Sequence, residues 1–368
     1  MRRALNTVFL AVLFLGAGDL LAQEALVGLP QTAPKELARD IPGRLGQLGE
    51  TGVILREAPA SVRKAAAALW VREALAPLET PACVEVLERL GISTDSDARR
   101  WVTLFDSSRP VARAPGAREL LLPEALAAQD DAALELLRAT GLLPFEIALS
   151  GEWARVVAAR HLGPPVTDPV LRASRAARLE GVARLAGILV ALHGARIDPQ
   201  SLGRGLVLLD RDRVAFSREA LIARASHPVE RALIETFVED GLRWAIYEYL
   251  KGGETGLLAA LERPFVTPAE LMRPGMRRRG LKSDPSACSL GPRAAAALVT
   301  GRNDEGWASA LIGDAFSLAS AAAVTGRLAF ETEHEAERAR VRLKALGVSV
   351  RCEANPRVLA LTVAERVR

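Results

Sequence analysis

The pattern of apolar and polar residues predicts a mostly helical chain. Apolar residues recur at helical spacing in several long segments, and Gly or Pro marks many of their ends. Ser61 is expected to cap the first helix, and the glycine pair 252–253 is expected to end the last long one. The predicted helices of this part of the chain are 61–75, 81–90, 130–139, 144–162, 169–193 and 228–251.

A β-hairpin is predicted within the helical part, near residues 101–123. Residues 101–105 read as a strand, and the turn-rich segment 106–110 follows them. Residues 119–122 form the second predicted strand, which closes at Pro123. Two such runs joined by a turn-rich segment indicate a hairpin with a long loop.

The pattern changes again after a polar break at residues 282–285. Short runs of strand character then surround one charged helix, 333–346. This order predicts a small α+β module with helices on one face of an antiparallel sheet. The fold class is therefore α+β, with a mainly helical domain over 61–284 and a small α+β domain over 285–368. The predicted strands of the small domain are 313–319, 326–332, 348–352 and 358–363.

The N-terminus has the pattern of a secretory signal. Arg2 and Arg3 precede an apolar stretch over residues 4–18, and small residues near position 22 offer a cleavage site. We therefore expect a signal peptide over 1–22 and export to the periplasm or the exterior; an uncleaved N-terminal anchor is the alternative. No other segment is long and apolar enough to span a bilayer. Residues 23–60 carry several prolines and glycines without periodicity and are predicted to be an extension or linker.

Composition and charge narrow the function classes. The 368 residues are 49% hydrophobic and 25% charged, which indicates a globular protein. A net charge of +4 over this length is weak, and no stripe of basic and aromatic residues suggests nucleic-acid binding. Of the three cysteines at least one has no intramolecular partner, and the spacing does not decide whether Cys288 and Cys352 form a disulfide.

Residues 147–163 contain the outline of a zinc-peptidase helix without its histidines. The motif His-Glu-x-x-His places two imidazoles one turn apart on one face to hold zinc, and its Glu acts as the base. Here Gly151 and Arg155 stand at the two histidine positions, and the Glu is kept as Glu152. Gly has no donor atom, and a guanidinium cannot ligate a metal. We therefore predict no metal ligands and no cofactor.

With these residues in place, the chain resembles the bacterial gluzincin family of zinc metallopeptidases, whose core is peptidase MA-like. The family's third ligand is a Glu in an Ala-Leu-Val-Glu-Gly-Asp-Ala segment on the next helix, and Glu180 followed by Gly181 stands in the matching segment 177–185. The hairpin near 101–123 and the segments after residue 237 are also similar. The resemblance implies a gluzincin-like core and a vestigial site at Gly151, Glu152, Arg155 and Glu180, in a degenerate member of the family.

The retained residues allow two interpretations. Glu152 and Arg155 share a helix face, and Arg155 is predicted to bridge Glu152 and Glu180 where zinc lies in active relatives. The alternative is an exposed ion pair of little consequence. His161 lies on the opposite side of the helix and is interpreted as a capping or core residue.

The function that these observations favour is non-catalytic. We expect an exported metallopeptidase homologue, a pseudo-enzyme that binds or scaffolds a peptide or protein, with no nucleic-acid partner and no membrane contact beyond the signal peptide. The alternative is an active hydrolase or peptidase with a rebuilt site that uses Glu152 and Glu180. The substrate or partner and the oligomeric state do not follow from the sequence.

Overall fold

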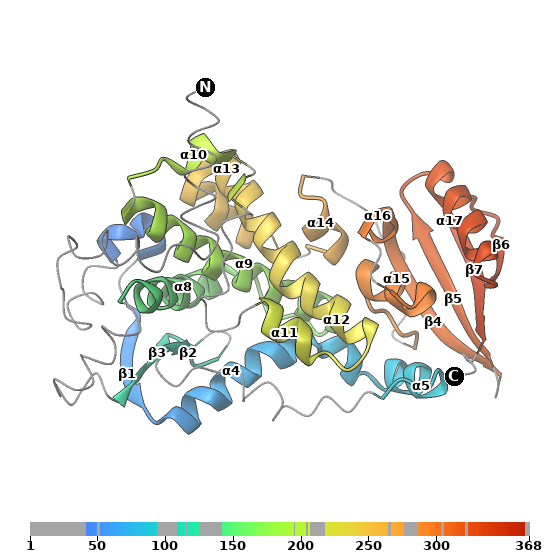
Figure 1. Ribbon diagram of the computed structural model, residues 1–368, viewed down its shortest axis with the longest axis horizontal. Coiled ribbons are helices and arrows are strands. Elements are labelled where there is room, and N and C mark those ends of the chain that lie inside the picture. Colours follow the sequence, from blue (N-terminus) through green and yellow to red (C-terminus); the bar gives the residue numbers. More distant parts are fainter. Residues whose placement is uncertain are drawn as a thin grey trace, which may run out of the picture. The chain divides into compact units, whose positions relative to one another are not determined.

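A computed structural model gives the fold of the chain (Figure 1). The structure describes residues 42–49, 52–93, 109–114, 117–124, 142–194, 196–203, 205–206, 218–263, 266–275, 286–302, 305–320 and 323–364. All of them belong to one unit, Asp40–Arg368. The predicted signal peptide, the strand 101–105, the helix 130–139 and the break at 282–285 lie outside the described residues. Helices and strands are both present, as the α+β prediction requires.

The first sheet has three strands in the order β1-β3-β2. β3 (Glu119–Pro123) confirms the predicted strand 119–122, but its antiparallel partner is the short β2 (Val111–Ala112), which lies in the predicted loop and not in the predicted strand 101–105. β3 also pairs in parallel with β1 (Ile54–Ala58), with Ile54 opposite Glu119. The assignment of 23–60 to a linker therefore has to be corrected at its end. Four of the five side chains of β1 are exposed, so the sequence of this strand lacks the alternating apolar pattern from which a strand is predicted.

Long helices form the core, and α9 (Pro169–Gly194) lies at its centre. α9 packs against α4 (Ala60–Ala74), α8 (Leu142–His161) and α13 (Gly241–Leu261). Two glycines make the contact with α13 close: a Cβ at Gly181 would overlap the carbonyl oxygen of Gly241, and one at Gly241 would overlap that of Ala177. Smaller elements join these helices: the 3-10 turns η1 (Gly46–Gly49) and η2 (Ala76–Glu79) and the helices α5 (Pro81–Arg89), α10 (Pro199–Leu202), α11 (Arg218–Arg224) and α14 (Pro268–Met272).

Two helix boundaries differ from the prediction. Pro59, not Ser61, stands at the N-cap of α4, and no side chain caps that end. The predicted helix 228–251 is α12 (Pro228–Glu235), a π-helical turn (Thr236–Asp240) and then α13. The glycine pair 252–253 has non-helical backbone angles and divides α13 into two helical segments, so the predicted helix end at residue 251 is confirmed.

The C-terminal part contains the predicted antiparallel sheet. Its strands are β4 (Leu311–Ser320), β5 (Ala323–Phe330), β6 (Ser349–Cys352) and β7 (Val358–Ala364), in the order β4-β5-β7-β6. α17 (Glu333–Ala345) begins at a capping box formed by Thr332 and Glu335 and packs on β5, β6 and β7. Two further helices, α15 (Pro292–Thr300) and the short α16 (Glu305–Ala308), precede β4 and were not predicted.

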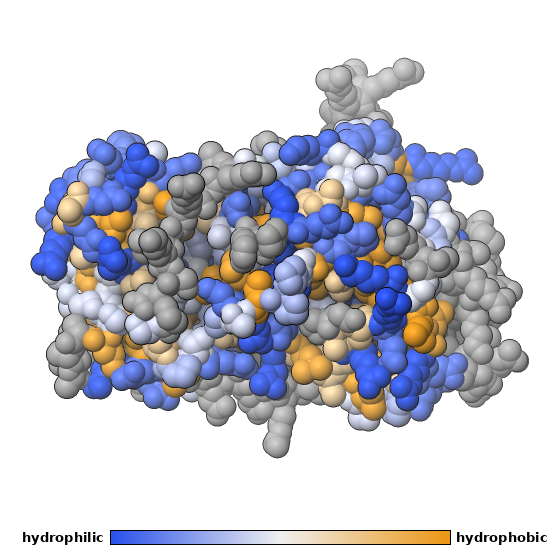
Figure 2. All heavy atoms as spheres, turned by 180° about the vertical axis from the view of Figure 1, so that it is seen from behind, coloured by the Kyte–Doolittle hydropathy of each residue, from blue (hydrophilic) through white to orange (hydrophobic). Residues whose placement is uncertain are grey.

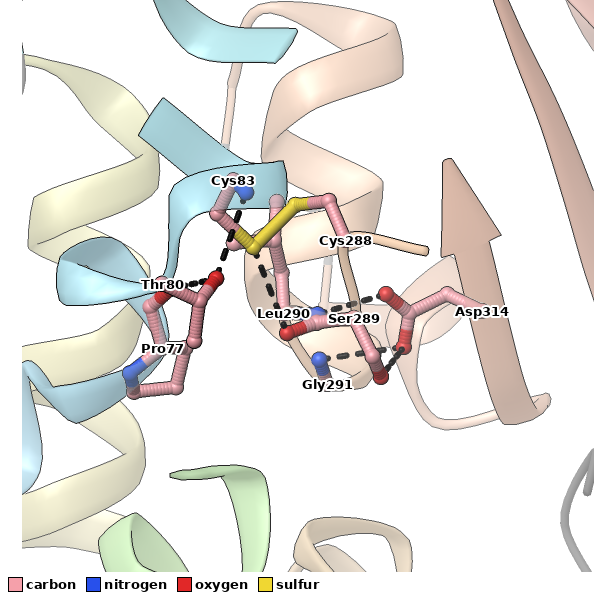
Figure 3. Close-up of a disulfide and its surroundings, with 8 residues drawn as sticks. All are labelled: Pro77, Thr80, Cys83, Cys288, Ser289, Leu290, Gly291 and Asp314. Carbon is pink, nitrogen blue, oxygen red and sulfur yellow. Dashed lines mark hydrogen bonds between the residues drawn. A yellow bond between two sulfur atoms is a disulfide. The ribbon is translucent and has the colours of Figure 1, made fainter. Parts of the chain in front are cut away.

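Strong links join the C-terminal part to the helical core. A disulfide connects Cys83 of α5 to Cys288, which lies just before α15 (Figure 3). Cys352, the other candidate partner of Cys288, is a free and exposed cysteine. On α15, Arg293 forms a fully buried, bidentate salt bridge with Asp240, with both N–O distances at 2.7 Å.

Asp314 holds the segment that follows the disulfide. Its carboxylate accepts the backbone N–H groups of Leu290 and Gly291 at 2.7 and 3.0 Å and lies near the Ser289 hydroxyl (Figure 3). Burial raises the pKa of Asp314 to about 6, although these hydrogen bonds act in the opposite direction. No cation of the described residues lies within salt-bridge distance of this carboxylate, so burial governs the shift.

We expect Asp314 to make the protein more stable at mildly acidic pH. An unfolded Asp titrates near pH 3.9, so between about pH 4 and 6 the folded state binds more protons than the unfolded state. The free energy of unfolding contributed by Asp314 therefore falls as the pH rises through this window, by an amount on the order of 3 kcal/mol. Urea unfolding of the wild type and of Asp314→Asn at several pH values measures it, with exposed Glu88→Gln as the control. A difference between wild type and Asp314→Asn that does not change with pH would contradict this expectation.

The surface shows no concentration of apolar side chains on the face drawn in Figure 2, where hydrophobic and hydrophilic residues are interspersed. Among the described residues, the large apolar side chains that are exposed are Ile54, Leu55, Val62, Leu69, Val341 and Leu346. No helix in the described part of the chain combines the length and the apolar character that a membrane crossing needs.

Candidate functional site

The candidate site lies where α8 packs against α9. Residues 163–165, Gly-Pro-Pro, follow the end of α8 and cannot continue the helix. The chain turns back at Asp168, whose Oδ1 accepts the N–H groups of Val170 and Leu171 and so caps α9. The two helices therefore lie side by side (Figure 1). The contacts of Gly151 with Ala183 and of Arg155 with Glu180 place residues 151–155 opposite residues 180–184.

Arg155 forms the predicted bridge between the two carboxylates. Its Nε donates to Glu152 Oε2 at 3.2 Å, and its Nη2 lies 3.1 Å from Glu152 Oε1 and 2.6 Å from Glu180 Oε2. Glu180 Oε1 accepts a further hydrogen bond, from Nε of Arg184, at 2.6 Å. The four residues are at most 1% exposed, so the alternative of an exposed ion pair is wrong.

Three members of this cluster were not predicted from the sequence. Arg184 lies four residues after Glu180 on α9, a spacing that does predict contact on one helix face. Trp70 of α4 lies under the Arg155 guanidinium, with 4.9 Å between the guanidinium carbon and the ring centre. The backbone N–H of Ala112 in β2 donates to Glu152 Oε2 at 2.8 Å. Nothing in the sequence near Trp70 or Ala112 signals either contact.

The cluster is electrically balanced, with two guanidinium groups and two carboxylates. Burial raises the pKa of Glu152, and the single guanidinium of Arg155 only partly offsets that effect. Burial acts in the same direction on Glu180, but Arg155 and Arg184 together hold the pKa of this carboxyl below its usual value. The two carboxylates in turn raise the pKa of Arg155 against the opposing effect of burial. Glu180 is therefore the more firmly ionised of the two acids.

Gly151 is required by the backbone packing. A Cβ at this position would lie 2.8 Å from the carbonyl oxygen of Ala183 on α9, closer than real Cβ contacts. The obstacle is backbone, which cannot turn aside as a side chain does. Any residue larger than Gly therefore has to push α8 and α9 apart.

The histidines lie away from this cluster. His161 is the last residue of α8, and its Nδ1 is 3.6 Å from Glu262, so it takes no part in the site, as predicted. His227 caps α12 by accepting the N–H of Glu230. His193 and His334 are exposed. No group of three or more His, Cys, Asp and Glu side chains in the described ranges is arranged to hold a metal ion.

Searches of protein-family models, of curated proteins and of solved structures found no match to this chain.

Proposed function

We propose that this chain is an exported, non-catalytic relative of the zinc metallopeptidases that acts by binding a peptide or a protein. One observation carries the proposal: all four oxygens of Glu152 and Glu180 accept hydrogen bonds from buried donors. The donors are two guanidinium groups and the backbone N–H of Ala112. No carboxylate oxygen of the cluster is left to act on a substrate.

The cluster supports a structural role for Arg155, whose positive charge would take the place of the metal ion of an active peptidase. A metallopeptidase needs ligands with lone pairs and a Glu that reaches a metal-bound water. At the two histidine positions this chain has Gly151, without a side chain, and Arg155, which only donates. The Arg155 guanidinium lies between Glu152 and Glu180 and supplies the positive charge that holds them together.

The rival proposal, a hydrolase rebuilt from Glu152 and Glu180, is less well supported. When one carboxylate acts as the acid and the other as the base, the attacking water and the bond to be cut must lie between them. Here the space between the two is taken by Arg155, and neither carboxylate is exposed. A base in this position would first have to break its ion pair.

The disulfide supports the export part of the proposal. Disulfides persist in oxidising compartments and are rare in a reducing cytoplasm. Cys83 and Cys288 are both fully buried and are bonded across 205 positions of sequence, so the bond is part of the folded core. A protein built in this way suits the periplasm or the exterior.

The zinc content of the purified protein tests the proposed function directly. After dialysis we expect far less than one zinc per chain. Gly151 and Arg155 have no lone pair to bind a metal, and the carboxylate of Glu180 is already paired with Arg155 and Arg184. Elemental analysis by mass spectrometry measures it. In parallel, the wild type and Glu152→Gln are expected to leave a peptide library equally intact. About one retained zinc per chain, or cleavage that disappears in Glu152→Gln, would overturn the pseudo-enzyme proposal.

A further inference from the structure

A pocket of about 520 Å³ opens beside the buried cluster, at the C-terminal end of α8. Its size is in the range of sites for small ligands. α4, the end of α8, the linker after α8 and the first turns of α9 form its walls. The residues that line it are Trp70, Glu73, Ala159, Leu162, Gly163, Pro164, Pro165, Val166, Arg172, Arg175, Ala176 and Leu179.

Most of the wall is apolar and rigidly held. The indole of Trp70 is fixed on both sides, because its Nε1 donates to the carbonyl oxygen of Ala112 at 2.9 Å and Arg155 stacks on its ring. Leu162 and Val166 lie on either side of residues 163–165, whose two prolines restrict the backbone. An apolar side chain of a ligand would meet a preformed surface here.

Three charged residues line the pocket, Glu73, Arg172 and Arg175, and the charges of the first two cancel. Arg172 donates to both carboxylate oxygens of Glu73, at 2.8 and 3.2 Å. Arg175 has no carboxylate within salt-bridge distance among the described residues, and Glu73 acts on it only at longer range. The pocket therefore carries a net charge of +1 from these three side chains.

Arg175 is positioned by the linker and has donors to spare. Its Nη1 donates to the carbonyl oxygens of Gly163 and Pro164 at 2.7 and 2.8 Å, which fixes the plane of the guanidinium. Its Nε and Nη2 make no hydrogen bond within the described part of the chain. Partial burial lowers the pKa of Arg175, the effect expected of a cation that lacks a close anion.

The neighbouring Arg178 adds to the positive potential. It is buried one turn along α9 from Arg175 and donates to the carbonyl oxygens of Leu261 and Arg263 at the end of α13. Burial lowers the pKa of Arg178 to about 9, and Arg175 acts in the same direction. Two guanidinium groups without a close carboxylate therefore lie on one side of α9.

We propose that this pocket binds a carboxylate joined to an apolar side chain, with Arg175 holding the carboxylate and the apolar wall at Leu162 and Val166, backed by the buried Trp70, holding the side chain. The C-terminus of a peptide that ends in an apolar residue has this chemistry, and so does a free carboxylic acid. The inference rests on the proposed function in one respect: it assumes that the protein binds the ligand without cleaving it. A planar guanidinium with two free donors matches a carboxylate well.

Three probes separate the sources of this chemistry. Acetyl-Ala-Ala-Leu with a free carboxylate, the same peptide as its C-terminal amide, and octanoate are titrated into the mature, oxidised protein by calorimetry. We expect the acid peptide to bind about tenfold or more tightly than the amide, because the amide cannot accept a charge-assisted pair from Arg175. Octanoate that binds as tightly as the acid peptide assigns the pocket to free acids. No binding of either acid, or equal binding of acid and amide, overturns the proposal.

Variants locate the binding in the pocket. Arg175→Gln keeps one donor for the linker carbonyls and is expected to weaken the acid peptide about tenfold without changing the amide. Ala159→Phe fills the pocket from α8 and is expected to abolish binding of both peptides. Arg327→Gln, at an exposed ion pair with Glu353 on the C-terminal sheet, is the matched control and is expected to bind as the wild type. Unchanged affinity in both pocket variants overturns the proposal, and melting curves check that each variant is folded.

The state of the peptide after the titration distinguishes a failure of this proposal from a failure of the proposed function. Mass spectrometry of the probe after the titration shows whether it is intact. A cut peptide refutes the non-catalytic function, whatever the affinity. An intact peptide that does not depend on Arg175 refutes only the assignment of this pocket.

Discussion

Arg155→Ala is expected to lower the free energy of unfolding by about 3–5 kcal/mol, the usual effect of breaking a buried ion pair from one side. The substitution leaves Glu152 without its cation and Glu180 with Arg184 alone, all of them within the α8–α9 interface. Two carboxylates would then repel each other without water to screen them. It also removes the guanidinium that covers the Trp70 ring.

A second variant separates the charge effect from simple loss of packing. Arg155→Met together with Glu152→Gln removes one positive and one negative charge and keeps the Glu180–Arg184 pair intact. The Gln carbonyl still accepts the N–H of Ala112. We therefore expect this double variant to recover much of the loss, since no unpaired charge remains.

Urea unfolding measures both variants, and Arg72→Ala is the control. Arg72 forms an exposed pair with Glu79, and its removal is expected to change the free energy of unfolding by no more than about 1 kcal/mol. If Arg155→Ala has no larger effect than Arg72→Ala, the buried bridge does not exist as described. If Arg155→Met with Glu152→Gln is no more stable than Arg155→Ala, unpaired charge is not the cause.

Loss of the Cys83–Cys288 disulfide is expected to have an effect of similar size. The bond closes a loop of 205 residues, and in the chain-entropy account a loop of this length is worth about 5 kcal/mol. The links that remain between the helical core and the C-terminal part, such as Arg293 with Asp240, are formed in the folded state only. They do not restrict the unfolded chain as a covalent bond does.

Cys83→Ser with Cys288→Ser tests this expectation by urea unfolding. The reduced wild type should have nearly the same stability as this double variant, because both lack the same cross-link. Cys352→Ser is the matched control and should unfold as the oxidised wild type does, since Cys352 is a free, exposed cysteine. Equal stability of the oxidised and the reduced wild type would show that the bond does not form in solution.

Local patterns predicted much of this fold. The long helices α8 and α9 and all strands of the C-terminal sheet follow from periodicity and from the Gly and Pro residues at their ends. The contact of Arg155 with Glu152 was predicted from their i,i+3 spacing on one helix. Its contact with Glu180 on the next helix was predicted from the family resemblance. The same spacing rule applies to Arg184, which follows Glu180 by four residues on α9.

The features that were missed depend on contacts between distant segments. β1 has mostly exposed side chains and is a strand because its backbone pairs with β3, more than 60 positions later. Cys83 pairs with Cys288 across 205 positions, and no spacing rule connects them. At the glycine pair 252–253 the predicted stop is present, but a second helical segment of α13 begins directly after it. Tertiary packing overrides local propensity at such places.

The glycine at position 151 bears on the history of the protein as well as on its packing. Under the proposed ancestry, a single codon change back to histidine would place a Cβ 2.8 Å from the Ala183 carbonyl oxygen, before any imidazole is fitted. The reversion would have to coincide with a shift of α9 and with the removal of Arg155. Each of these changes is harmful alone. Under that ancestry, the close packing of the two helices acts as an evolutionary ratchet: selection can refine what the protein binds but can no longer return it to catalysis by single steps.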